Sequence, residues 1–178
     1  NFLFKVLPVG KVLLKIQKGL FTLVSYVQTY SGKMAQVSRV ESTLPKQTSD
    51  KGTIPKIAVV LGSYDHIEKV LDSLGLKGQF TTYDNVIGLL HGGAQATLNQ
   101  YDALFINCGT SETCTSVDSY RDLLRSYVEK GGRLYVTDQS YDFVEQVFPE
   151  YIRFGGSNAN QANSTPEAQN SAQHGTAG

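Results

Sequence analysis

The sequence predicts an α/β protein in which a β-rich leading segment precedes a parallel sheet with helices between its strands. The apolar run Ile-Ala-Val-Val-Leu at 57–61 is typical of a strand covered on both faces. Apolar residues then follow at helical spacing, at Ile67, Val70, Leu71 and Leu74. Upstream, Val12, Leu14 and Ile16 alternate with the polar residues Lys11, Lys15 and Gln17, which is the period of a half-buried strand. Strand and helix alternation in the later part implies right-handed crossovers and a parallel sheet.

Residues 1–45 are predicted to form a partial antiparallel β-sandwich. We expect four short strands, near 2–7, 11–17, 21–30 and 34–41, separated by turn sequences at Pro8–Gly10, Lys18–Gly19 and Ser31–Gly32. The following residues, 46–54, are polar and contain Gly and Ser, so they are predicted to be a linker.

Residues 55–154 are predicted to form the α/β domain. Further strands are expected at 79–83, 103–106, 134–136 and 151–154. Helices are expected over 67–74, ended by Gly75, over 117–127, with Thr115 and Asp118 as a capping box, and over 141–148.

The last segment, 155–178, has no aliphatic residue larger than Ala and no aromatic residue. It lacks the apolar surface needed to offset the entropy of ordering, so we predict a disordered tail. Asn163 begins an Asn-Ser-Thr glycosylation sequence, which has meaning only in a secretory setting.

Charge is balanced over the chain of 178 residues but divided between its parts. Residues 1–56 hold nine Lys and Arg against two acids, a net +7, and residues 57–178 carry a net −7. A net charge of zero argues against a nucleic-acid binder, and no apolar run has the length of a membrane span. Opposite charges on the two parts favour their association, within one chain or between chains. No basic and apolar leader precedes Asn1, so we expect that the ends come from processing or from a longer protein.

The first part resembles the C-terminal half of a carboxypeptidase-regulatory-like (transthyretin-like) β-sandwich. The residues that carry the resemblance are Phe2-x-Phe4-x-x-Leu7-Pro8-x-Gly10, Val12-x-Leu14-x-Ile16, Gly19-x-Phe21, and Ser31-Gly32-Lys33 leading to Val37. The resemblance implies a spacer or adhesive module of a secreted or surface protein whose first strands are missing.

Residues 55–154 are similar to a class I glutamine-amidotransferase-like (ThuA-like) domain. The residues concerned are Ile57–Gly62, Tyr101–Gly109, Leu124-x-x-Tyr127-Val128-x-x-Gly131-Gly132 and Leu134–Asp138. The resemblance implies a flavodoxin-like sheet with strand order 2-1-3-4-5. Working amidotransferases carry a nucleophilic Cys in a G-x-C-x-G turn and a later His-x-Glu. Here the turn reads Thr137-Asp138-Gln139-Ser140-Tyr141 and no His-x-Glu follows, so we expect binding rather than catalysis.

Ligands of doubly wound sheets bind beyond the carboxyl ends of the strands, where the strand order reverses. For this order the crevice lies between the first and third strands. We expect it to be lined by Ser63, Tyr64, Asp65, His66, Asn107, Cys108, Gly109, Ser111, Asp138, Ser140 and Tyr141. The alternative is that these are ordinary polar loop residues, some of which cap the next helix.

The two cysteines leave three alternatives open. Cys108 and Cys114 lie in one loop, and a secreted setting favours a disulfide between them. They are otherwise two reduced thiols, or Cys108 is a nucleophile with His66 as its base. A hydrolase built from Ser63 or Ser140 with His66 and Asp138 lacks the G-x-S-x-G motif. We expect no metal site and no cofactor.

These observations predict a non-enzymatic structural or interaction module that is secreted or on the cell surface. Its expected partners are a second copy of itself or another surface protein chain, with no nucleic acid and no membrane span. The alternatives are a hydrolase- or transferase-like enzyme and a carbohydrate-binding protein, both using the crevice at the strand ends.

Overall fold

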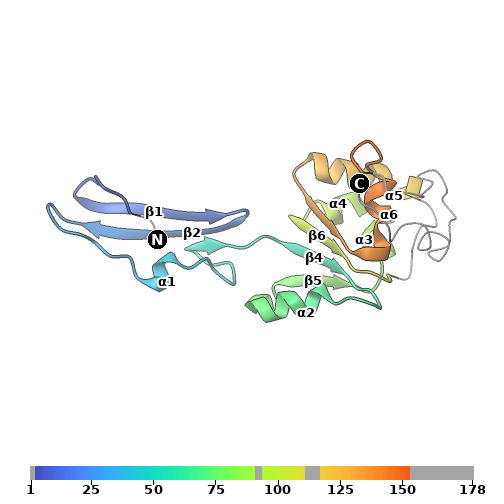
Figure 1. Ribbon diagram of the computed structural model, residues 1–178, viewed down its shortest axis with the longest axis horizontal. Coiled ribbons are helices and arrows are strands. Elements are labelled where there is room, and N and C mark those ends of the chain that lie inside the picture. Colours follow the sequence, from blue (N-terminus) through green and yellow to red (C-terminus); the bar gives the residue numbers. More distant parts are fainter. Residues whose placement is uncertain (1–2, 91–93, 111–116, 153–178) are drawn as a thin grey trace. The chain divides into compact units, whose positions relative to one another are not determined.

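A computed structural model of the chain describes residues 3–90, 94–110 and 117–152. The chain divides into two compact units, Asn1–Pro55 and Lys56–Gly178. The first contains an antiparallel sheet and the second a parallel sheet with helices, so the predicted mixed α/β class is confirmed (Figure 1). The predicted tail at 155–178, with Asn163, lies outside the described residues.

The first unit is built on a long hairpin. Strands β1 (Gly10–Lys18) and β2 (Phe21–Thr29) pair antiparallel along their whole length. A turn of two residues joins them, and its first residue, Gly19, has a φ of 58°, a conformation that glycine adopts without steric cost. Strand β3 (Gly52–Thr53) adds to β2, so the sheet has the order β1-β2-β3.

Two of the four strands predicted in this unit are wrong. Residues 3–7 form no strand, and the residues predicted as a strand at 34–41 are irregular before helix α1 (Arg39–Ser42). The reason is a capping box, in which the Ser38 hydroxyl accepts from the Glu41 backbone N–H and the Glu41 carboxylate accepts from the Ser38 N–H. The hydrogen bonds from Ser38 also lower the pKa of Glu41.

The predicted linker at 46–54 is also corrected, because it contains β3 and belongs to the first unit. Gly52 makes this pairing fit. A Cβ atom at Gly52 would lie 2.6 Å from the Thr22 carbonyl oxygen, so only glycine permits the approach.

The second unit contains four parallel strands, β4 (Ile57–Val60), β5 (Phe80–Tyr83), β6 (Ala103–Ile106) and β7 (Arg133–Val136). They lie in the order β5-β4-β6-β7. All four residues of β4 are buried, as the apolar run predicts. Tyr151 and Ile152 lie in no strand, so the fifth strand predicted at 151–154 does not form there.

The predicted helices are present, with different bounds. Helix α2 (Ile67–Leu71) runs into a π-helical turn at Asp72–Leu76, in which Gly75 leaves the helical conformation with a φ of 84°. Helices α5 (Val117–Glu129) and α6 (Asp142–Glu145) follow β6 and β7. The capping role predicted for Thr115 lies outside the described residues. None of the described helices combines the length and apolar character of a membrane span.

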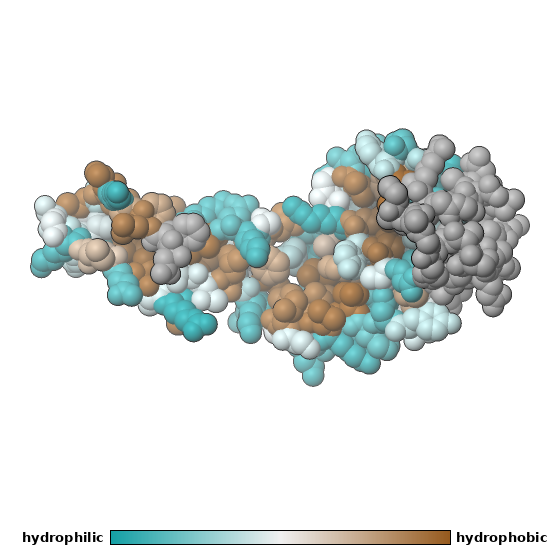
Figure 2. Space-filling model, in the orientation of Figure 1, coloured by the Kyte–Doolittle hydropathy of each residue, from teal (hydrophilic) through white to brown (hydrophobic). Residues whose placement is uncertain are grey.

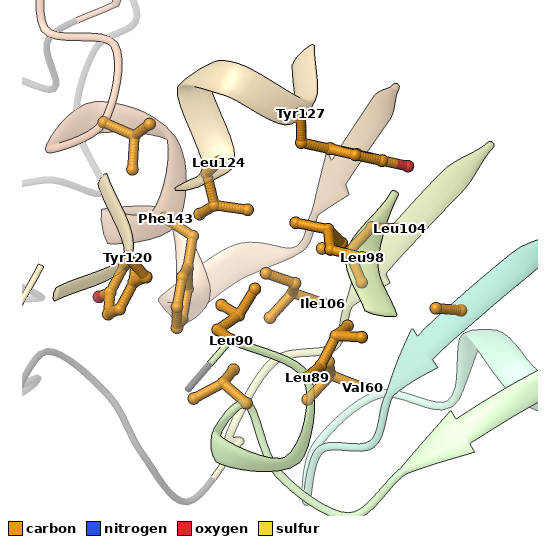
Figure 3. Close-up of a cluster of buried hydrophobic side chains, with 13 residues drawn as sticks. Val60, Leu89, Leu90, Leu98, Leu104, Ile106, Tyr120, Leu124, Tyr127 and Phe143 are labelled. Carbon is orange, nitrogen blue, oxygen red and sulfur yellow. The ribbon is translucent and has the colours of Figure 1, made fainter. Parts of the chain in front are cut away.

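The core of the second unit lies on one face of its sheet (Figure 3). Two helices here were not predicted from the sequence, α3 (Ile87–Leu90) and α4 (Ala94–Leu98). Side chains of α3, α4, α5 and α6 pack against alternate residues of β4 and β6, namely Ala58, Val60, Leu104 and Ile106. The ring of Phe143 stacks on Tyr120 with 5.0 Å between centroids. This packing fixes β4, β6 and β7, and with them the loops at their carboxyl ends.

Candidate functional site

The loops that leave β4 and β6 at their carboxyl ends are joined by their own main chain. The Ser63 N–H donates to the Gly109 carbonyl over 3.2 Å, and the Tyr64 N–H donates to the Cys108 carbonyl over 3.2 Å. This is the place where the strand order reverses, and where the sequence predicts the crevice. The structure therefore brings the predicted residues together, but in contact with one another.

Two glycines allow the loops to approach so closely. A Cβ atom on Gly62 would lie 2.1 Å from the Cys108 carbonyl oxygen, which is far inside van der Waals contact. A Cβ atom on Gly109 would lie 2.5 Å from the ring of Tyr64. The main chains of the two loops are thus in direct contact at Gly62 and Cys108, while the ring of Tyr64 beside Gly109 is 72% exposed.

The amide of Cys108 connects all three loops. Its N–H donates to Asp65 Oδ1 over 2.7 Å and to Thr137 Oγ1 over 2.9 Å. Its Sγ lies 3.7 Å from Asp138 Oδ2, and the residue is only 2% exposed. Cys114 lies outside the described residues, so the disulfide and its two alternatives stay predictions.

Asn107 is the centre of a second set of polar contacts. Its side-chain NH₂ group donates to Glu68 Oε2 over 2.9 Å, and its main-chain carbonyl accepts from the Ser140 hydroxyl over 2.9 Å. Glu68 in turn lies 2.9 Å from Nδ1 of His66. Within the described part of the chain, Asn107 Oδ1 and the Thr110 hydroxyl are buried without a hydrogen-bond partner. A buried polar atom of this kind carries a desolvation cost.

Asp138 has an unusual backbone conformation. Its φ is 39°, and it is the one residue other than glycine with a positive φ in the described part of the chain. The residue directly follows Thr137 at the end of β7 and begins a 3₁₀ turn, Asp138–Ser140. Such strain is found at functional positions, and here it falls on the turn that follows β7.

Two of the three candidate nucleophiles are buried. Cys108 is almost completely buried, and Ser140 is buried with its hydroxyl donated to Asn107. Ser63 is exposed, while the imidazole of His66 contacts Glu68. No group of three or more His, Cys, Asp or Glu side chains gathers to hold a metal ion in the described part of the chain.

Two residues of this site were missed by the sequence interpretation. Glu68 connects His66 to Asn107, and Thr137 accepts from the Cys108 N–H. Both carried a signal, since Thr137 directly follows a predicted strand and Glu68 lies in the first turn of a predicted helix. Of the predicted residues, Ser111 lies outside the described ones, and Tyr141 precedes α6 with its N–H donated to the Asp138 carbonyl.

Comparisons of this chain with protein-family models, with curated proteins and with solved structures found no match.

Proposed function

We propose that this protein is a non-catalytic module that binds another protein chain. The observation that carries the proposal is the closure of the crevice by its own main chain, with Gly62 against the Cys108 carbonyl. Cys108, the nucleophile that such a crevice would need, is only 2% exposed at this contact. The buried hydroxyl of Ser140 points to the same conclusion.

A second observation favours binding through the first unit. This unit exposes many large apolar side chains, among them Leu3, Phe4, Val6, Leu7, Leu13 and Met34. Figure 2 shows apolar surface on this unit in brown. Large exposed apolar patches mark interaction surfaces on soluble proteins. The chain that covers them is, in this proposal, a second copy or another surface protein.

We further propose a fold family for each unit. The order β5-β4-β6-β7 supports a flavodoxin-like sheet of order 2-1-3-4-5, to which a fifth strand would add beside β7. The strained Asp138 supports an amidotransferase-like domain that lacks its nucleophile. The long hairpin supports a partial carboxypeptidase-regulatory-like sandwich, and with it a secreted or cell-surface location.

Thiol accessibility tests the proposal directly. The native protein is treated with iodoacetamide, and the labelled peptides are identified by mass spectrometry, which separates Cys108 from Cys114. We expect Cys108 to be labelled only after denaturation, because a buried thiol is inert. Rapid labelling of Cys108 in the native, folded protein would show an accessible thiol and would overturn the closed crevice.

A turnover screen addresses the enzymatic alternative. The wild type is assayed against esterase, amidase and glycosidase substrates, next to Ser63→Ala, Cys108→Ala and Asp138→Asn. We expect no turnover above the buffer rate. Activity that any of these three substitutions abolishes would establish an enzyme instead. Calorimetric titration with saccharides tests the carbohydrate alternative, for which we expect no heat of binding.

A further inference from the structure

Strand β1 is the outer strand of the first sheet and has one unpaired edge. The sheet order is β1-β2-β3, so β2 occupies one side of β1 only. No backbone group of the described residues hydrogen-bonds to the other side of its nine residues. At the start of β1, the Thr29 hydroxyl of β2 hydrogen-bonds to the carbonyls of Pro8 and Gly10. An uncovered edge of this length is a template for another strand.

The turn decides which residues of β1 offer their backbone groups to a partner. In a hairpin with a two-residue loop, the flanking residues form a hydrogen-bonded pair, here Lys18 and Phe21. Pairing then alternates along the strand. The even-numbered residues of β1 therefore face β2, and the odd-numbered residues turn their N–H and C=O groups outward.

The side chains of β1 select one register for pairing with a second β1. Antiparallel pairing about a two-fold axis at Leu14 includes all nine residues of the strand. In this register Val12 lies opposite the partner's Ile16, Leu14 opposite the partner's Leu14, and Leu13 opposite the partner's Lys15. Apolar residues meet on one face, and no lysine lies directly opposite another lysine.

The neighbouring registers are worse. An axis at Leu13 places Lys11 opposite the partner's Lys15, and an axis at Lys15 places that residue opposite the partner's Lys15. Like charges directly opposite each other destabilise a strand pair. Axes further toward either end leave part of the strand unpaired. The lysines that protect this edge from arbitrary strands thus also discriminate between registers.

We propose that two copies of this chain associate through antiparallel pairing of their β1 strands, with the two-fold axis at Leu14. This inference rests on the proposed binding function and names its partner and its surface. Pairing of this kind is isologous and uses the edge on both copies, so it ends at a dimer. The two three-stranded sheets become one continuous sheet.

Charge gives this dimer a characteristic salt dependence. The first unit has eight Lys and Arg residues against two acids, so two copies of it repel each other. Salt screens that repulsion, since the Debye length is about 8 Å at physiological ionic strength. The dimer should therefore become tighter as salt is added. Attraction between the basic unit of one copy and the acidic unit of another would become weaker instead.

Light scattering after size-exclusion chromatography measures the association of the intact chain. We expect the wild type to approach twice the monomer mass with rising concentration and salt. Leu13→Pro removes one outward N–H and leaves the hairpin bonds intact, so it should return the mass to that of the monomer. Leu13→Thr is the matched control, because it keeps the N–H and a strand-forming side chain and should remain dimeric. Circular dichroism confirms that both variants are folded.

A cysteine crosslink tests the register without proline. Leu14→Cys places two thiols across the axis in a non-hydrogen-bonded pair, where Cα atoms are about 4.5 Å apart, within reach of a disulfide. Val12→Cys is the control, because four residues separate its two copies along the strand, about 13 Å at 3.3 Å per residue. Oxidation should yield a covalent dimer of Leu14→Cys alone, compared with the wild type on non-reducing gels.

The outcomes separate this inference from the proposed function. A wild type that stays monomeric at every concentration and salt overturns the β1 dimer, and so does a dimer that survives Leu13→Pro and gives no Leu14→Cys crosslink. Neither result bears on turnover or on the labelling of Cys108. The proposed non-catalytic function would then stand, with a different chain as the partner.

Discussion

Strands β1 and β4 are both fully paired on at least one side, but their surroundings are opposite. All four residues of β4 are buried, between β5 and β6 in the sheet. None of the nine residues of β1 is buried, and Leu13 is 54% exposed. Backbone pairing is thus present in both units, and only the second adds an apolar core to it. A hydrogen bond contributes little net free energy, so the two units differ in what holds them together.

The two units also differ in how many apolar side chains they bury outside these strands. The second unit gathers side chains from β4, β6 and four helices into one cluster. Among residues 3–55, Leu23 is the one buried large apolar side chain. An isolated hairpin is marginal in water, and three strands need an apolar face that packs on something. We therefore expect the second unit to be the more stable of the two, and the first to gain stability from the partner proposed above.

The same substitution, Leu to Ala, made in each unit gives the strongest test of this difference in packing. Leu104→Ala should lower the free energy of unfolding of the second unit by about 4 kcal/mol, because the fully buried side chain leaves a cavity. Leu13→Ala should change the first unit by less than about 0.5 kcal/mol in the monomer. Urea unfolding of dilute protein, followed by the amide NMR signals of each unit, measures both. Equal effects would contradict the comparison.

A pair of glycines within the second unit tests how tightly its loops are packed. Gly62→Ala should cost about 3 kcal/mol, because its Cβ atom meets the Cys108 carbonyl. Gly78→Ala is the matched control, since Gly78 has a φ of 74° and open space around it. That substitution should cost only the backbone strain, about 1 kcal/mol. A Gly62→Ala protein as stable as the control would mean that the loops separate easily.

The alkaline limit of the second unit should depend on Tyr127. Burial raises the pKa of this phenol from 10.0 to about 12. A group whose pKa is raised on folding contributes stability below its unfolded pKa and loses it as the pH rises through the folded value. Thermal unfolding should therefore show stability falling between pH 10 and about 12. Tyr127→Phe should remove this part of the pH dependence, and an unchanged profile in that variant would exclude Tyr127 as its source.

The smallest expected effect lies on the exposed face of the first unit. The Lys11 ammonium lies 4.2 Å from the centroid of the Tyr26 ring. Lys11→Gln removes this cation–π contact and should cost about 0.5 kcal/mol, because the pair is exposed. Lys15→Gln controls for the loss of one positive charge in the same strand. Unfolding of the whole first unit in Lys11→Gln would show that the exposed face contributes far more to its stability than this single contact.

The sequence was most informative where a pattern had a single physical solution. The run at 57–61 predicted a strand buried on both faces, and β4 is buried at every residue. Gly75 predicted the end of a helix, and it has the positive φ that ends one. The polar residues after β4, β6 and β7 were expected at one place because parallel strands end on the same edge, and hydrogen bonds do join them.

Predictions failed where a local signal competed with a periodic one. Residues 34–41 were predicted as a closing strand after the Ser31–Gly32 turn, but Ser38 and Glu41 make the capping box that begins α1. Residues 46–54 have the composition of a linker, although Gly52 within them is needed for the close pairing of β3. Helices α3 and α4 were missed because each is short, with four and five residues, which is too few for a periodic pattern. The loops after β4 and β6 touch although they are distant in the sequence, and no spacing of residues along the chain predicts that contact.

The shared amide of Cys108 also has a consequence for the motions of the second unit. Its N–H bonds to Asp65 and Thr137 at once, and its carbonyl accepts from Tyr64. The loop after β6 is thus bonded to both of the others, and it cannot move away without breaking its contacts with each of them. Hydrogen exchange in this part of the molecule should thus occur through a rare collective opening, and the Cys108 amide should exchange as slowly as the strands beneath it.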